Sequence, residues 1–452
     1  MSKRLQINKQ NKYLSILKFI LIAGFLLIGL LKPYGPFDLS HFFIFGVLLG
    51  YFLLKHFSAN NLVIFFSAII LAILSASLSG KGTYVLVTVM ILLSQMYTFL
   101  FRKVFEKLPY ILLVHIILFF LVSSYFNSAN LRPLIEKEPQ AESYFTDHLS
   151  FLKVYYLIGQ NFNYYSAEVK AHIEDGRADT IPQKSWYWRL PTYAYFWDLL
   201  PGRTGISIYF GFLFLSTLML IFTYKIARIF LPLNLAILSP YLLLPYLHFA
   251  ARDLAFLEME WWGVTFVVIG IYFVLKSKYL LSFIFLTLAV FFKETFMIYI
   301  ATIGLLSFLH KSKKVFYMTI LISASLGIYL IFHFLKINNY THQGLSGLTP
   351  TSHPPGPFFL RQTLSYGSWE YLFFRIRPFS LLLILSLIST AFLLIKKELS
   401  FTLSILVIPV FVFAISLIKI GSIPFDDYWG AAYVPLLLIM TPILLFKSLM
   451  RD

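Results

Sequence analysis

The chain contains no cysteine and few charged residues. Cysteine is absent from all 452 positions, which excludes disulfide bonds, catalytic thiolates and cysteine-ligated zinc. Charged residues make up only 13% of the sequence, against 59% hydrophobic residues and a mean hydropathy of +0.78. Soluble globular chains carry about 25% charged residues. The composition therefore excludes a set of soluble domains and predicts a polytopic membrane protein.

Acidic residues are scarce relative to basic ones. The chain has 20 acidic and 37 basic residues and a formal net charge of +17. Such an excess can bind nucleic acid, but here the charges fall in short runs between apolar segments. If the N-terminus is cytoplasmic, nineteen basic and three acidic residues lie on the cytoplasmic side, and the opposite side carries seventeen of each. This pattern follows the positive-inside rule, so we expect both termini in the cytoplasm and no nucleic-acid partner.

The apolar runs predict an all-α fold of about fourteen transmembrane helices, since about 20 helical residues cross the hydrocarbon core and lipid requires internally paired backbone. The first run follows basic residues but is too long for a signal-peptide core, so we expect it to stay in the membrane. The predicted spans are Tyr13–Leu31, Leu39–Leu54, Leu62–Leu78, Tyr84–Phe101, Pro109–Phe126, Ile206–Phe222, Leu233–Phe249, Trp261–Leu275, Tyr279–Phe292, Phe296–Leu309, Val315–Phe334, Phe379–Ile395, Ser400–Ile418 and Ala431–Phe446.

Three parts follow from this order: four additional N-terminal helices in 1–108, a core in 109–446 and a cytoplasmic tail in 447–452. The core has two large outer loops, 127–205 and 336–378. In the first, 149–159 and 164–175 have helical periodicity, which predicts helices along the membrane surface. The run 279–309 is divided at Lys293, because the lysine clusters at its two ends both favour the cytoplasm.

Asp147 and Arg189 are the leading candidates for chemistry in the first outer loop. A carboxylate at the outer surface can act as a general base on a hydroxyl group, although an acid in a loop can also be merely solvated. Arg189 lies in the aromatic segment WYWRLPTYAYFW. Its guanidinium can bind a phosphate through two parallel donors, or it can contact lipid headgroups. Both residues belong to the side that holds 17 of the 20 acidic residues.

Further candidates lie on the same predicted side. The charge of Lys293 is energetically unfavourable at shallow membrane depth unless a partner neutralises it. That partner is either Glu294 or the phosphate of a lipid carrier. His333, His342 and His353 lack metal-ligand spacing, and we predict no metal site. Lys18 and His115 are the visible ionisable residues of the spans, which disfavours a transporter. The remaining candidate binding residues are His148, Glu258, Arg375, Arg377 and Tyr428.

The order of these parts resembles the GT-C superfamily, polytopic glycosyltransferases that take sugars from polyprenyl-phosphate donors outside the cytoplasmic membrane. The resemblance covers roughly 109–446 and includes branches such as the aminoarabinose transferases and protein O-mannosyltransferases. It depends on Asp147 opening the outer loop, the YYLIGQNFNYY stretch, Arg189-Leu190-Pro191, ARDLAFLEMEWW, LAVFFKET and DDYWGAAYVP. The acid is followed here by a histidine instead of a second acid, and the basic motif has one proline instead of two.

The resemblance implies a GT-C-like fold and inverting transfer of a sugar to a hydroxyl group of a glycan, lipid or protein. It implies Asp147 as the base and Arg189 and Lys293 as ligands of the donor phosphate. No cofactor is expected beyond the lipid-linked donor, because two basic residues can stabilise a leaving monophosphate; a divalent metal stays open. The alternatives are an O-antigen ligase or polysaccharide polymerase that uses diphosphate-linked glycans, and a lipid or sugar flippase without enzyme activity.

Overall fold

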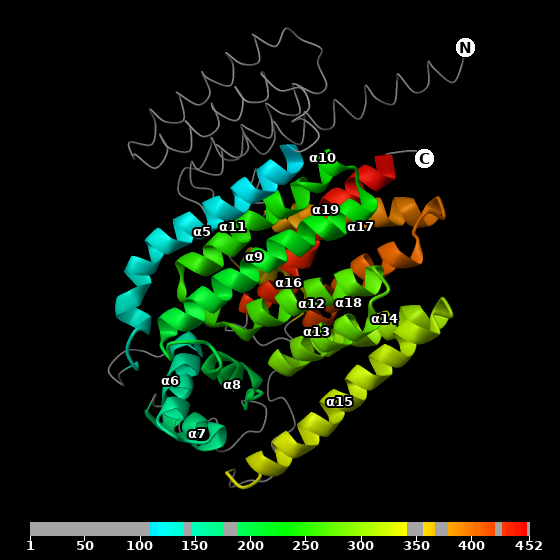
Figure 1. The fold of residues 1–452 in the computed structure, drawn as a ribbon. Helices are drawn as coiled ribbons and strands as arrows, with labels where there is room; N and C mark the ends of the chain where they lie inside the picture. Colours follow the sequence, from blue (N-terminus) through cyan, green and yellow to red (C-terminus); the bar gives the residue numbers. More distant parts are fainter. Residues whose placement is uncertain are drawn as a thin grey trace, which may run out of the picture.

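The structure is a computed structural model, and it describes residues 108–139, 147–174, 188–340, 356–366, 378–420 and 427–449. Every regular element in these ranges is a helix (Figure 1). The elements are α5 (Leu108–Ile135), α6 (Asp147–Gly159), α7 (Tyr164–Glu174), α8 (Thr192–Asp198), α9 (Gly205–Phe230), α10 (Leu233–Ala236), α11 (Leu238–Arg252), η3 (Leu254–Leu257), α12 (Met259–Leu275), α13 (Tyr279–Phe292), η4 (Glu294–Phe296), α14 (Met297–Leu309), α15 (Lys313–Ile337), α16 (Pro357–Ser365), α17 (Pro378–Ile395), α18 (Phe401–Ile420), η7 (Asp427–Ala432) and α19 (Val434–Leu449).

Among the described residues, three helices are long and apolar enough to cross a membrane: Gly205–Phe230, Lys313–Ile337 and Phe401–Lys419. The same part of the chain contains five shorter apolar helices of 10–17 residues. The prediction of a helical membrane protein is confirmed at this level. The first four predicted spans, from Tyr13 to Phe101, lie outside the described residues.

Two helix boundaries differ from those of the predicted spans. The span Pro109–Phe126 is predicted to end where the outer loop begins, at residue 127, whereas helix α5 continues to Ile135. Hydropathy falls after Phe126, whereas the helix continues until the turn that contains Pro133. The predicted span Leu233–Phe249 is two helices, α10 and α11, with Ile237 between them. Pro240 lies in the first turn of α11, where its missing N–H group costs nothing.

The two helices predicted in the first outer loop are present. The expected segments 149–159 and 164–175 correspond to α6 and α7, and a turn with Asn161 at φ 70° joins them. Their orientation along a membrane surface stays a prediction. The Tyr156 hydroxyl donates to the Ile135 carbonyl oxygen at 2.7 Å and accepts from the Gly205 N–H at 3.1 Å, so α6 is fixed to the ends of α5 and α9. A Cβ at Gly205 would lie 2.1 Å from the Ile135 oxygen, so this junction requires glycine.

The division of 279–309 at Lys293 is confirmed. Helix α13 ends at Phe292, and Lys293 adopts an extended backbone before η4 and α14. Near the start of α13, the Lys314 ammonium lies 5.9 Å from the centroid of the Tyr279 ring. Near its end, the Phe291 and Tyr329 rings stack at 4.5 Å. Helices α13 and α15 therefore run in the same direction. Helix α14, which lies between them in the sequence, returns in the opposite direction, and both lysine clusters lie at one end.

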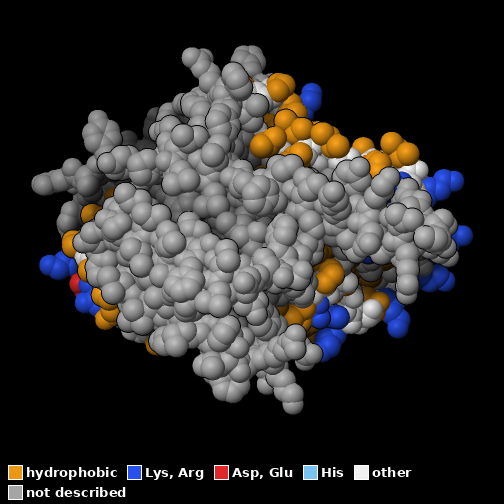
Figure 2. Space-filling view, turned by 90° about the horizontal axis from the view of Figure 1, so that it is seen from above, with side chains coloured by type: hydrophobic (Ala, Val, Ile, Leu, Met, Phe, Trp, Pro, Cys, Tyr) orange, Lys and Arg blue, Asp and Glu red, His pale blue; other side chains and the backbone are white. Residues whose placement is uncertain are grey.

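Other contacts define this basic end of the bundle. Lys225 of α9 lies 5.7 Å from the Tyr272 ring centroid near the end of α12, and the His310 ring lies 5.0 Å from Phe401 at the start of α18. In Figure 1 the α14–α15 and α17–α18 connections lie at the right, whereas α6, α7 and α8 lie at the lower left. Lys and Arg side chains correspondingly gather along the right edge of Figure 2. We call the opposite end, where α6–α8 contact the bundle, the α6–α8 end.

Candidate functional site

Glu258 occupies the junction between η3 and α12 at the α6–α8 end. The Asp253 side chain accepts a hydrogen bond from the Leu254 N–H at 2.7 Å and caps η3. The Trp262 indole N–H donates to the Phe256 carbonyl oxygen at 2.8 Å, which holds η3 against the first turn of α12. Glu258 is the N-cap residue of α12, but its side chain makes no capping hydrogen bond. The segment ARDLAFLEMEWW thus directs this carboxylate away from its own helix.

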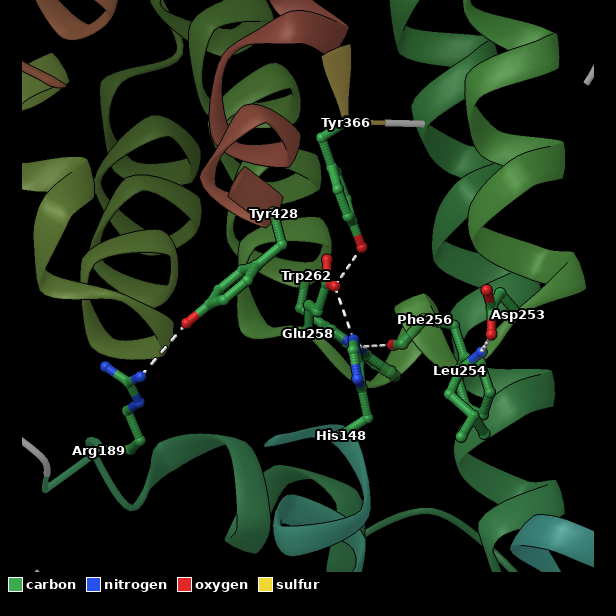
Figure 3. A network of polar contacts seen from close by, with 9 residues as sticks. All are labelled: His148, Arg189, Asp253, Leu254, Phe256, Glu258, Trp262, Tyr366 and Tyr428. Carbon is green, nitrogen blue, oxygen red and sulfur yellow. Dashed lines mark hydrogen bonds and ion pairs between the residues drawn. The ribbon is translucent and has the colours of Figure 1, made fainter. Parts of the chain in front are cut away.

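The Glu258 carboxylate contacts two distant parts of the chain (Figure 3). Its Oε1 atom lies 2.7 Å from Nε2 of His148 in the first turn of α6. The Tyr366 hydroxyl, just after α16, donates to the same oxygen. The Glu258 side chain is 2% exposed and the His148 side chain is 24% exposed. A buried acid, a partly exposed imidazole and a phenol therefore form one network that joins three elements.

Burial raises the pKa of Glu258 to about 7, from an ordinary value of 4.5. The hydrogen bonds from His148 and Tyr366 act in the opposite direction, and the nearby Glu260 carboxylate raises the pKa further. Oε2 of Glu258 is buried, and none of the described residues donates a hydrogen bond to it. A carboxyl group with such a pKa changes its protonation state near neutral pH.

Arg189 lies at the same end on the segment that leads into α8. The flanking side chains of Trp188 and Leu190 are buried, and the Tyr164 hydroxyl donates to the Arg189 carbonyl oxygen at 2.7 Å. These contacts hold the backbone, while the guanidinium is half-buried and donates to the Tyr428 hydroxyl at 3.3 Å. Tyr428 belongs to η7, just before α19. The aromatic segment thus directs a permanent cation towards the start of the last helix.

Lys293 makes a buried ion pair beside these groups. Its Nζ atom lies 3.0 Å from Oε1 of Glu260, and both side chains are 2% exposed. The ammonium also lies 5.4 Å from the centroid of the Trp429 ring. The interpretation that Glu294 is its partner is wrong, because the turn at Lys293 brings the end of α13 to the start of α12. Lys293 neutralises Glu260, so Arg189 is the more accessible cation of the two.

The structure brings five of the predicted site residues to the α6–α8 end: His148, Arg189, Glu258, Lys293 and Tyr428. Asp147 is the first residue of α6, but its side chain lies outside the described part of the structure. Arg375 and Arg377 also lie outside the described residues.

Tyr366, Glu260 and Trp429 complete the site. Glu260 and Trp429 stand in segments that the sequence marks as candidates. No pattern marks Tyr366, because its contact with Glu258 joins residues 108 positions apart. No group of three or more histidine and acidic side chains able to hold a metal ion occurs among the described residues.

Comparisons of the chain with protein-family models, with curated proteins and with solved structures give no match. Function must therefore be inferred from the chemistry of the site itself. A half-buried guanidinium and a carboxylate–imidazole pair lie at the same end of an apolar helical bundle (Figure 3). The first can stabilise an anionic leaving group, and the second can accept a proton.

Proposed function

We propose that the protein is a membrane glycosyltransferase of GT-C type. It would transfer a sugar from a polyprenyl-phosphate donor to a hydroxyl acceptor, with inversion, on the outer face of the cytoplasmic membrane. The observation that supports this best is the gathering of His148, Glu258, Arg189 and Tyr428 at the end of the bundle opposite the lysine-rich connections. By the positive-inside rule that end faces away from the cytoplasm. The acceptor would be a hydroxyl group of a cell-envelope glycan, glycolipid or protein.

Arg189 has the chemistry that a lipid-linked sugar phosphate requires. When the bond between the anomeric carbon and the phosphate oxygen breaks, its electron pair leaves with the polyprenyl phosphate. A guanidinium donates two parallel hydrogen bonds to such an oxyanion, and it does so best where water is partly excluded. Arg189 is half-buried and already donates to the Tyr428 hydroxyl at 3.3 Å. Both residues would therefore contact the donor phosphate.

The exposed faces of the outer helices suit a lipid donor. Helix α15 has several apolar side chains that are more than half exposed, among them Ile320, Leu321, Ile331 and Phe332. These side chains face away from the protein core, as lipid-facing residues do. A polyprenyl chain can lie among such helices while its phosphate remains at the membrane surface near Arg189.

A proton acceptor is needed for the acceptor hydroxyl, and the start of α6 offers two. Asp147 is the base that the resemblance implies, and His148 follows it directly. Both belong to the turn of α6 that Glu258 holds against α12. The acceptor hydroxyl would thus approach the anomeric carbon from the side of α6, while the phosphate leaves on the side of Arg189.

Sugar transfer by the purified protein in lipid nanodiscs tests this proposal. Polyprenyl-phosphate donors with labelled sugars are supplied with acceptor lipids or glycans, and the release of polyprenyl phosphate is measured. We expect transfer by the wild-type protein and a loss of about 100-fold or more in Arg189→Ala, the scale of losing one oxyanion donor. Arg252→Ala is the matched control, because Arg252 is an exposed arginine at the end of α11.

Three outcomes would contradict this proposal. Equal activity of Arg189→Ala and Arg252→Ala would remove Arg189 from the site. Transfer only from diphosphate-linked glycans, with release of a polyprenyl diphosphate, would identify a polymerase or ligase instead. Movement of the lipid across the membrane without any transfer would identify a flippase.

A further inference from the structure

We propose that the His148 imidazole, oriented by the Glu258 carboxylate, accepts the proton of the acceptor hydroxyl. This inference rests on the glycosyl transfer proposed above and assigns its base to His148 instead of Asp147. In this proposal Glu258 is a positioning residue that acts through the imidazole. A base oriented by a third group is a recurring arrangement in enzymes in which histidine activates a hydroxyl nucleophile.

The contact with Glu258 engages one of the two nitrogens of the His148 ring. Nε2 of His148 lies 2.7 Å from Oε1 of Glu258, and the Tyr366 hydroxyl donates to that same oxygen. When Glu258 is ionised, its oxygen accepts both hydrogen bonds, and the neutral imidazole then carries its proton on Nε2 and its lone pair on Nδ1. The ring is 24% exposed, whereas the carboxylate behind it is 2% exposed. The acceptor can therefore reach the imidazole but not Glu258.

Burial strengthens the electrostatic interaction between the Glu258 carboxylate and the imidazolium of His148. A carboxylate sealed from water interacts more strongly with a neighbouring charge than a solvated one does. It therefore stabilises the imidazolium that forms when His148 takes up a proton. The other titratable groups that the described residues place around Glu258 are Tyr366 of α16 and Glu260 of α12. Glu260 is paired with Lys293, so its charge is largely balanced.

The proposed step balances without a further reactant. The acceptor hydroxyl loses its proton to Nδ1 of His148 while its oxygen forms a bond to the anomeric carbon of the sugar. The bond from that carbon to the phosphate oxygen breaks, and the electron pair leaves with the polyprenyl phosphate beside Arg189. Glu258 remains ionised and pairs with the imidazolium. The proton then returns to water through the exposed edge of the ring.

The test compares four variants of the full-length protein in the nanodisc assay. His148→Ala should lower the transfer rate about 100-fold or more, the scale of losing a general base, and added imidazole should restore part of that rate. Glu258→Gln should lower the rate at neutral pH and move the rising limb of the pH–rate profile to lower pH, because the ring becomes less basic. Asp147→Asn should stay within about tenfold of the wild type. His310→Ala, an exposed histidine at the basic end, is the control.

The outcomes separate this inference from the proposed function. Transfer that survives in His148→Ala but is lost in Asp147→Asn would overturn the role of His148 and return the base to Asp147, with the transferase intact. A folded His148→Ala variant that imidazole does not rescue would also overturn it. If the wild-type protein transfers no sugar from any polyprenyl-phosphate donor, the proposed function itself fails. Elution as a single peak in size-exclusion chromatography shows that each variant is folded.

Discussion

Replacing Lys293 by methionine should destabilise the protein strongly. The Lys293 Nζ and Glu260 Oε1 atoms lie 3.0 Å apart, and both side chains are 2% exposed. Removing one partner of such a pair leaves an uncompensated charge in the interior, which costs about 3–5 kcal/mol. Replacing both partners by apolar residues of similar size removes that charge as well. The double variant Lys293→Met/Glu260→Met should therefore recover most of the stability that the single variant loses.

Thermal unfolding in detergent, followed by tryptophan fluorescence, measures these differences. Lys276→Met is the matched control: Lys276 is exposed after α12, and such surface changes stay within about 0.5 kcal/mol. If Lys293→Met melts together with this control, the buried ion pair does not exist. If the double variant melts no higher than Lys293→Met, the cost does not come from an unpaired Glu260 charge. Transfer activity retained by the double variant would show, in addition, that Lys293 does not bind the donor phosphate.

Two further predictions concern the same end of the bundle. A Cβ at Gly263 would lie 2.1 Å from the Phe296 ring, so Gly263→Ala should cost about 1–3 kcal/mol, and Gly263→Ala/Phe296→Leu should recover part of this in the same melting assay. The pKa of Glu258 is raised by folding to about 7 from 4.5, so its contribution to stability is present below pH 4.5 and falls by about 3 kcal/mol as the pH rises to 7. The melting temperature of the wild type relative to Glu258→Gln should therefore fall between pH 5 and pH 8, and a constant difference would contradict a proton on the folded carboxyl group.

The sequence predicts those features of the fold that depend on hydropathy and charge. The division at Lys293 follows from two lysine clusters that favour the same side, and the structure places Lys278 and Lys314 at one end of the bundle. The helices of the first outer loop follow from their periodicity. The end of α5 cannot be predicted in this way, because a helix can continue through polar residues beyond the membrane. Hydropathy detects only the apolar part of the helix that crosses the hydrocarbon core.

The site is less predictable than the fold, because its contacts join distant segments. Composition and motif order mark Glu258 and Arg189 as candidates, but not the partners of either residue. Glu260 rather than Glu294 pairs with Lys293, since the turn after α13 directs the ammonium towards α12. Tyr366 follows a short amphipathic helix and has no local feature that indicates a contact with Glu258. Such pairings are set by packing and cannot be derived from spacing along the chain.

The most direct test of the central claim is the side of the membrane on which the site lies. The chain contains no cysteine, so single cysteines can be introduced without any other change. Leu199 is 82% exposed in the connection between α8 and α9, and Lys313 is exposed at the basic end. In intact cells, a membrane-impermeant maleimide should label Leu199→Cys but not Lys313→Cys, which should react only after permeabilisation. The reverse pattern would place the His148–Glu258 network in the cytoplasm and contradict glycosyl transfer on the outer face.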